Sequence, residues 1–346
     1  MPKDVPKGIC AEEVTDWFAA HVAGAKPPLH FSLITGGHSN LTYKVEDAAG
    51  QSFVLRRPPL GAVIATAHDM AREHRIIAAV GPTEVPVPPV LGLCEDESVN
   101  DAPFYVMAFV EGHVLSDAEG TAKILSEPAR ARLGEHVIEI LAALHAVDPD
   151  AIGLGDLGRK ESYLARQIKR WSTQWEKTRT RELPAMEEVA QQLRAEMPEQ
   201  VGAAIVHGDY RLGNMLSLEE GRVAAVLDWE LCTLGDPLAD VGFVMNNWAE
   251  ADEPLLRGAA AISPTSCGGF PSRAEFLREY SERTGRDVSR VPYYRAFQYW
   301  RLAAIVEGVL SRYLKGVMGG AADTGAFQKQ VDGLADAAVQ LLREQG

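Results

Sequence analysis

The chain has 346 residues, of which 46% are hydrophobic and 24% charged, a composition typical of a globular protein with a buried core. Its formal net charge of −14 is spread along the sequence, which argues against a general nucleic-acid or membrane-binding surface. The cysteines form no CxxC pair, and neither the first residues nor any later stretch holds an apolar run of signal-peptide or membrane-span length. We therefore expect a cytoplasmic protein with reduced thiols and with no zinc site or disulfide framework.

The first third of the chain is predicted to form an antiparallel sheet. Short apolar or alternating runs are separated by turns rich in Gly, Pro and Asp, which is typical of strands. These runs are FSLI, LTYKV, SFVLRR, PVLGLC and PFYVMAFV, between Phe31 and Val110.

One helix is expected within this sheet region, in TAHDMAREHRIIAAV at 66–80. Met70, His74, Ile77 and Ala78 recur at helical spacing, and the Gly-Pro pair at 81–82 ends the pattern.

The remainder of the chain reads mainly as helices. Apolar residues recur at helical spacing in 133–144 and in segments near 161–178, 186–197, 237–249, 273–284, 291–315 and 325–343. The strand-like pieces expected there are AAIV, NMLSL and RVAAVLD. The fold class predicted is α+β with two lobes, 1–110 and 111–346, joined near FVEGHV.

Two features of the first lobe are suited to binding a phosphorylated ligand. Gly36 and Gly37 form a turn between two strands, followed by Ser39 and Asn40, although such hairpins are also common for conformational reasons alone. Arg56 ends the next strand, and Glu73 of the following helix could hold its guanidinium in place.

The strongest chemical signal is HGDYRLGN at 207–214. Asp209 and Asn214 have the spacing of the Asp and Asn in the H-R-D-x-x-x-x-N loop of kinases. Such a loop brings a carboxylate to a substrate hydroxyl and turns an amide oxygen toward a magnesium ion. Fourteen residues after Asn214, a strand delivers Asp228, which could complete the metal site. Each of these residues alone could cap a turn, but together they favour phosphoryl transfer.

The chain resembles the aminoglycoside phosphotransferase family of small-molecule kinases. It resembles in particular the branch found beside, or fused with, acyl-CoA dehydrogenases. The similarity runs from Thr35 to about Tyr313 and rests on the stretches TGGHSNLTY, VLRRPP, REHRI, VHGDYRLGNML, VLDWELCTLGDPLADVG and RLAAIVEGVLSRY. These motifs are specific for fold and reaction type, and much less so for the substrate.

The resemblance implies a protein-kinase-like fold that uses ATP and Mg²⁺. It implies that Asp209 is the catalytic carboxylate and that Asn214 and Asp228 bind magnesium. Arg56 takes the place where many kinases have lysine, with Glu73 beside it. The nucleotide phosphates would lie under Gly36, Gly37, His38, Ser39 and Asn40, and the adenine at the hinge formed by Met107, Ala108, Phe109 and Val110. His207 and Asp240 are expected to support the catalytic loop.

The acceptor remains open at this level. The branch points to a small molecule with a hydroxyl group, such as a hydroxyacyl-CoA, and to a functional link with an acyl-CoA dehydrogenase. Aminoglycosides and other small alcohols are alternatives. The acceptor site is expected in the region after Asp228, the SPTSCGGFP loop at 263–271 and the helix at 291–315, where Tyr299, Trp300, Arg301 and Glu307 are conceivable contacts. Glu230 or Glu307 would suit an aminoglycoside, whereas Arg295 and Arg301 would favour an anionic acceptor. A nucleotide-binding pseudoenzyme is a further alternative, whereas a metal-dependent hydrolase would need clustered histidines that this segment lacks.

Overall fold

A computed structural model describes residues 5–34, 40–61, 69–251, 253–254, 263–316 and 323–344. The chain forms two compact units. The first comprises Met1–Gly112 together with Ala224–Glu230, and the second comprises His113–Val223 and Leu231–Gly346. Within the described residues, no helix combines the length and the apolar composition that crossing a bilayer would require.

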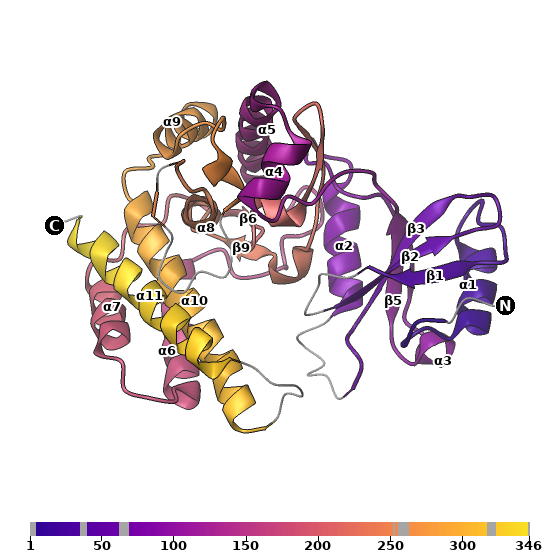
Figure 1. Cartoon of the computed structure of the whole chain (residues 1–346), viewed down its shortest axis with the longest axis horizontal. Helices are drawn as coiled ribbons and strands as arrows, with labels where there is room; N and C mark the ends of the chain where they lie inside the picture. Colours follow the sequence, from indigo (N-terminus) through magenta and orange to yellow (C-terminus); the bar gives the residue numbers. More distant parts are fainter. Residues whose placement is uncertain are drawn as a thin grey trace. The chain divides into compact units, whose positions relative to one another are not determined.

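The first unit is built on an antiparallel sheet (Figure 1). Its described strands lie in the order β1-β2-β3-β5-β4, and β2 and β3 are in register with Tyr43 opposite Leu55. These strands correspond to the five predicted runs, and their bounds are β1 His30–Leu33, β2 Leu41–Glu46, β3 Ser52–Arg57, β4 Val90–Cys94 and β5 Phe104–Ala108.

Two helices cover opposite faces of this sheet, α1 (Ala11–His21) and α2 (Met70–Val80). Phe18 of α1 packs in a buried core with Phe104 and Val106 of β5. Because successive side chains of a strand point to opposite faces, Tyr105 lies on the other face of the sheet. The helix α2 packs against β4 and β5 on that face. The face under α2 is the one that carries the polar residues described below.

The predicted helix at 66–80 is confirmed from Met70 onward, whereas α1 and the single turn α3 (Glu97–Asn100) were not predicted from the sequence. The described part of α1 buries only Val14 and Phe18, one helical turn apart, so its apolar stripe is too short to give a periodic signal.

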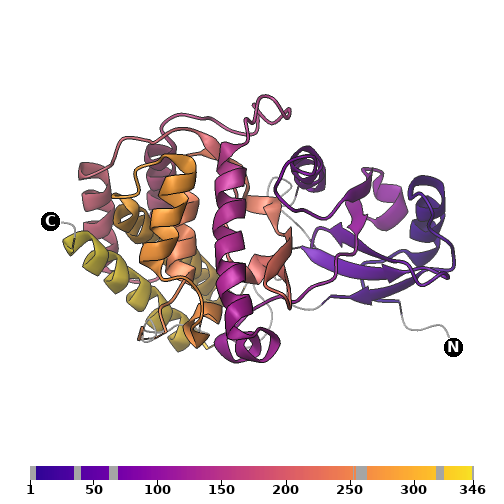
Figure 2. The same cartoon turned by 90° about the horizontal axis from the view of Figure 1, so that it is seen from above.

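The second unit is mainly helical and includes the predicted helices. Its long helix α10 (Val291–Leu314) packs against α11 (Thr324–Arg343), α8 (Leu238–Asn247) and α6 (Tyr163–Thr178). In Figure 2, α10 in orange and α11 in yellow lie side by side, as they do in Figure 1. The other α-helices that the structure describes in this unit are α4 Ala118–Ile124, α5 Glu127–Ala146, α7 Pro184–Ala195 and α9 Arg273–Thr284, and α4 was not predicted.

Short strands of the second unit position the loop that the sequence singled out. The buried strand β6 (Ala204–Val206) pairs with β9 (Thr233–Gly235), with Ile205 opposite Leu234. The three-residue β9 was not predicted, because TLG is too short for a strand pattern. The loop leads through a 3₁₀ turn, η1 (Leu212–Asn214), to β7 (Met215–Leu218). The chain then enters β8 (Arg222–Val226), whose last residues belong to the first unit. The predicted α+β class is confirmed.

Candidate active site

The loop predicted to be catalytic begins at His207, directly after β6, and its sharp turn depends on Gly208. The backbone of Gly208 has φ +84, and a Cβ there would lie 2.9 Å from the carbonyl oxygen of Leu231. Only glycine adopts this conformation without strain, and only glycine fits in this space.

Asp240 of α8 fixes the start of this loop. Its buried carboxylate accepts hydrogen bonds from the backbone amides of His207, at 2.6 Å, and Gly208, at 2.8 Å. The prediction that Asp240 anchors the loop through backbone amides is therefore confirmed. His207 also supports the loop, because its Nδ1 accepts a hydrogen bond from the amide of Asp209 at 3.2 Å.

A second layer of buried groups stands behind Asp240. His145 of α5 places Nε2 3.4 Å from the carboxylate of Asp240 and Nδ1 2.7 Å from the hydroxyl of Tyr280 on α9. Burial lowers the pKa of His145, although the carboxylate of Asp240 opposes this shift. The loop is thus held by residues from three helices.

The chemistry-bearing side chains at the end of the loop contact one another. The amide Nδ2 of Asn214 donates to the backbone carbonyl of Asp209 at 2.9 Å and to its carboxylate at 2.7 Å. The Nε of Arg211 lies 3.3 Å from the other oxygen of the same carboxylate. Because the amide nitrogen of Asn214 faces Asp209, its Oδ1 is the atom suited to a cation.

In the first unit, Arg56 is the centre of an acidic cluster. Its Nε lies 3.1 Å from Glu73, which confirms the predicted pairing, and its Nη2 lies 2.6 Å from Asp228. Glu230 lies 3.8 Å from the same nitrogen and accepts a hydrogen bond from Asn40 at 3.2 Å. The sequence did not place Glu230 in this cluster, although its position two residues after Asp228 was a usable signal.

Electrostatics favour a permanent positive charge on Arg56. Burial by itself would lower the pKa of the guanidinium, but Glu73, Tyr105, Asp228 and Glu230 outweigh burial and raise this pKa. Burial raises the pKa of Glu73, and the nearby Arg56 opposes that shift. The three carboxylates therefore keep the guanidinium of Arg56 charged and fix its position.

Asp228 itself has an unusual backbone conformation. It follows β8 with φ +66, a region that L residues with a Cβ seldom adopt. Strain of this kind persists where the surrounding structure holds it in place, and it is concentrated at functional sites. Here the bond to Arg56 fixes the carboxylate.

The donors of these residues have the chemistry that Mg²⁺ prefers. Asp228 supplies carboxylate oxygens and Asn214 an amide oxygen, which suit a hard cation that keeps several waters. The two residues belong to different units, and within the described residues no cluster of three or more His, Cys, Asp or Glu side chains has metal-binding geometry. The donor chemistry of the two side chains therefore fits a magnesium ion.

Only some of the remaining predicted nucleotide contacts lie within the described residues. Gly36, Gly37, His38 and Ser39 lie outside the described residues. At the predicted hinge, Met107 is buried in β5, and the amide of Ala108 already donates to the carbonyl of Pro89 at 2.8 Å. Phe109 lies under the ammonium of Lys44, 5.0 Å from the ring centre, and Val110 follows it. Hydrogen bonds to an adenine at this hinge would have to use groups other than the Ala108 amide.

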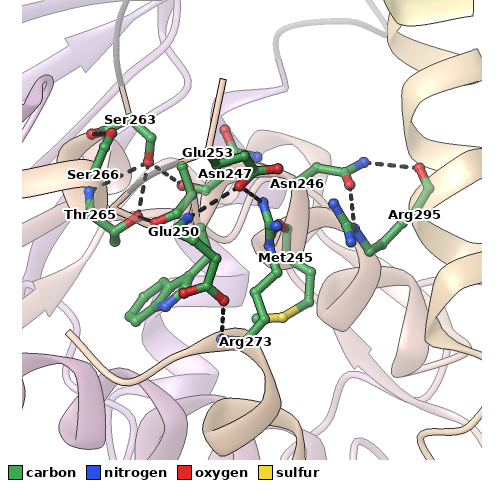
Figure 3. A network of polar contacts seen from close by, with 12 residues as sticks. Met245, Asn246, Asn247, Glu250, Glu253, Ser263, Thr265, Ser266, Arg273 and Arg295 are labelled. Carbon is green, nitrogen blue, oxygen red and sulfur yellow. Dashed lines mark hydrogen bonds and ion pairs between the residues drawn. The ribbon is translucent and has the colours of Figure 1, made fainter. Parts of the chain in front are cut away.

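The second unit contains a cavity of about 770 Å³ beside the catalytic loop. Arg211, Leu212 and Gly213 form one wall, and α8, α10 and α11 form the others. A polar layer of α8, α9, α10 and the Ser263 segment lies along this cavity (Figure 3), and its lining members include Asn246, Asn247, Glu253, Ser263, Ser266, Arg273 and Arg295. The segments at 263–271 and 291–315 were expected from the sequence to form the acceptor site, and both contribute to this lining, whereas Arg273 was not expected there.

The acceptor contacts considered from the sequence separate into two groups. Tyr299 lines the cavity. Trp300 is buried and donates to the carbonyl of Met186, and the buried Glu307 accepts hydrogen bonds from the amide and hydroxyl of Thr180. Arg301 lies over the ring of Trp171. Trp300 and Glu307 therefore stabilise helix packing.

Comparison with known proteins agrees with this geometry. The model of the phosphotransferase enzyme family (APH) matches residues 30–276. Acyl-CoA dehydrogenase family member 10 of Mus musculus is 35% identical over 315 residues, which cover 90% of this chain and 29% of that protein. The chain thus spans less than a third of the length of this curated relative.

Solved structures show the same fold. A Ralstonia eutropha JMP134 protein classed among the aminoglycoside phosphotransferases is 35% identical, with a TM-score of 0.82 and coverage of 96% of this chain and 98% of that one. A thermostable mutant of aminoglycoside phosphotransferase APH(4)-Ia, in a ternary complex with ADP and hygromycin B, is 17% identical, with a TM-score of 0.60 and coverage of 96% and 98%. The family match and the relatives at 35% identity show that the chain belongs to the phosphotransferase enzyme family, as its motifs indicated, and that it is a small-molecule phosphotransferase with a protein-kinase-like fold.

Proposed function

We propose that this enzyme transfers the γ-phosphate of ATP to a hydroxyl group of a small molecule, and that the acceptor is a hydroxyacyl-CoA or a related hydroxy acid. The observation that carries the proposal is the catalytic loop, where Asp209 is held by Asn214 and Arg211 beside a cavity large enough for a small molecule.

In the proposed reaction, the carboxylate of Asp209 orients the acceptor hydroxyl and accepts its proton as the new O–P bond forms. The bond between the γ-phosphorus and the β–γ bridging oxygen breaks, and ADP leaves. A bound magnesium ion supplies charge neutralisation on the phosphate oxygens. Asn214 holds the Asp209 carboxylate at 2.7 Å, so the base is oriented before the acceptor arrives.

The nucleotide is assigned to the lobe 1–110. Arg56, held by Glu73, is proposed to contact the phosphates, and the segment Gly36–Asn40 to cover them. The hinge Met107–Val110 is proposed to bind the adenine, and Asp228 and Asn214 to bind the magnesium ion. The complex of APH(4)-Ia with ADP and hygromycin B supports the use of a nucleotide and a small-molecule acceptor in this fold. The identity with an acyl-CoA dehydrogenase family member supports the acyl-CoA class of acceptor and a functional link with such an enzyme.

An acceptor screen tests this proposal. ADP release with ATP and Mg²⁺ is measured against hydroxyacyl-CoAs, free hydroxy acids, sugars, choline and aminoglycosides, and we expect turnover with the hydroxyacyl compounds. Preferred turnover of an aminoglycoside would replace the proposed acceptor class. A rise in melting temperature with ATP but no turnover on the whole panel would favour a nucleotide-binding pseudoenzyme.

The substitution Asp209→Asn tests the catalytic assignment. We expect turnover to fall by about a hundredfold or more, because the amide cannot accept the hydroxyl proton. The rise in melting temperature with ATP should persist. Asp16→Asn, at an exposed position of α1, is the matched control and should keep full activity. Full activity of Asp209→Asn would contradict the assignment.

A further inference from the structure

Some of the charged residues that line the cavity in the second unit form ion pairs, and others do not. The described charged side chains that line it are Arg211, Arg273, Arg295, Glu253 and Glu344. Arg211 is paired with Asp209 at 3.3 Å, and Arg273 with Glu253 at 2.6 Å. Glu344 is exposed at the end of α11. Arg295 therefore remains as the cation of the cavity lining that has no carboxylate bonded to it among the described residues.

Neutral groups hold Arg295 in place. Its Nε donates to the side-chain oxygen of Asn246 at 3.0 Å, and Asn246 donates back to the carbonyl of Arg295 at 2.9 Å. Figure 3 shows this reciprocal pair between α8 and α10. Tyr299, one turn along α10, also lies within hydrogen-bonding reach of the guanidinium. The guanidinium is therefore oriented without being neutralised.

This arrangement carries an electrostatic cost. Burial lowers the pKa of Arg295 and the like charge of Arg273 lowers it further, and together they outweigh Tyr299 and Glu253, which raise it. An anion bound beside Arg295 would relieve both effects, because it would compensate a desolvated charge and shield it from its neighbour. A polycation would increase the repulsion.

We propose that Arg295 binds an anionic group of the acceptor and that this enzyme selects anionic acceptors over polycationic ones. This inference rests on the proposed function, which makes the cavity the acceptor site. The shared chemistry is an oxyanion that accepts hydrogen bonds from a guanidinium. It is supplied either by the phosphates of a CoA thioester or by the carboxylate of a free hydroxy acid.

Steady-state kinetics with four acceptors test the inference. These are hydroxyhexanoyl-CoA, the same acyl group on pantetheine, which has no phosphate, free hydroxyhexanoate, and kanamycin. The variants are Arg295→Gln and Arg295→Lys, with Arg312→Gln as the matched control at an exposed position of the same helix. The melting temperature and its rise with ATP verify that each variant is folded and binds nucleotide.

We expect Arg295→Gln to raise the KM of the preferred anionic acceptor about tenfold or more, since a hydrogen bond to a charged group is lost. The KM for ATP should stay unchanged. The KM of Arg295→Lys for the anionic acceptor should lie between those of the wild type and Arg295→Gln, because lysine keeps the positive charge but loses the paired hydrogen-bond donors of the guanidinium. If Arg295→Gln raises the KM for the CoA thioester but not for the pantetheine thioester, the bound anion is the phosphates. If it raises the KM for hydroxyhexanoate, the bound anion is the carboxylate.

Two results would overturn the anion site. One is an equal effect of Arg295→Gln on charged and neutral acceptors, and the other is a wild-type preference for kanamycin. If the wild type phosphorylates none of the four compounds, the proposed function fails on these acceptors and the anion site is tested separately. Calorimetric titration with hydroxyhexanoyl-CoA and with hydroxyhexanoate then decides: weaker binding to Arg295→Gln supports the site, and equal or absent binding refutes it.

Discussion

Gly208 and Asp228 show how much of the chemistry depends on single backbone conformations. Both have positive φ, +84 at Gly208 and +66 at Asp228. Gly208 directly precedes Asp209, the proposed catalytic carboxylate, and Asp228 is itself a proposed magnesium ligand. The sequence indicated the loop that contains Gly208, because Asp209 and Asn214 have the spacing found in kinases. It did not indicate the strain at Asp228, because a left-handed aspartate has no local sequence pattern of its own.

We expect Gly208→Ala to lower the free energy of unfolding by about 2–3 kcal/mol, combining left-handed strain with the close contact to Leu231. Gly153→Ala is the matched control, because Gly153 has φ +75 and a Cβ there would meet no atom within 4 Å. It should cost about 1–2 kcal/mol from backbone strain alone. Urea unfolding measures both, and equal losses would show that the Leu231 contact does not matter.

At the scale of elements, the structure separates what periodicity can reveal from what it cannot. Long amphipathic helices such as α10 and α11 and the alternating strands of the sheet were predicted close to their observed positions. The set of side chains that lines the cavity was predicted only in part, because residues such as Arg273 and Arg295 come to line one cavity only after α8, α9 and α10 have packed. Contacts between distant segments depend on helix packing, which a local pattern does not encode.

The helix α2 offers a test of how an element supports the site. Asp69 caps α2 by accepting a hydrogen bond from the amide of Arg72 at 2.9 Å, and Glu73 lies in the same first turn. We expect Asp69→Ala to destabilise the protein by about 1 kcal/mol and to reduce the rise in melting temperature with ATP, since Glu73 would position Arg56 less firmly. Asp69→Ser retains a cap and should behave nearly as the wild type. Indistinguishable Ala and Ser variants would contradict the role of the cap.

For the whole molecule, buried histidine links stability to pH. His145 has a pKa below its ordinary value of 6.5 because it is buried and lies near Arg286, although Asp240 opposes the shift. Below pH 6.5 the unfolded chain therefore binds more protons at this histidine than the folded chain does, by at most one. Stability supplied by neutral His145 is present above pH 6.5 and is lost as the pH falls below that value.

We expect the free energy of unfolding of the wild type to fall between pH 7.5 and 5.5, by up to about 1.4 kcal/mol per pH unit from this group. His145→Gln should be less stable at pH 7.5 and should show a shallower fall. His21→Gln, on the exposed side of α1, is the control and should keep the wild-type slope. A variant at position 145 with an unchanged slope would show that other groups cause the fall.

The first unit is discontinuous in the chain, since Ala224–Glu230 completes a structure that otherwise ends at Gly112. During synthesis on a ribosome, Arg56 and Glu73 emerge long before Asp228 and Glu230, so the acidic cluster cannot assemble until more than a hundred further residues have been made. A fragment cut at Gly112 would present a charged arginine–glutamate pair without its later partners. The first unit is therefore expected to reach its final structure only after the chain has been synthesised past Glu230.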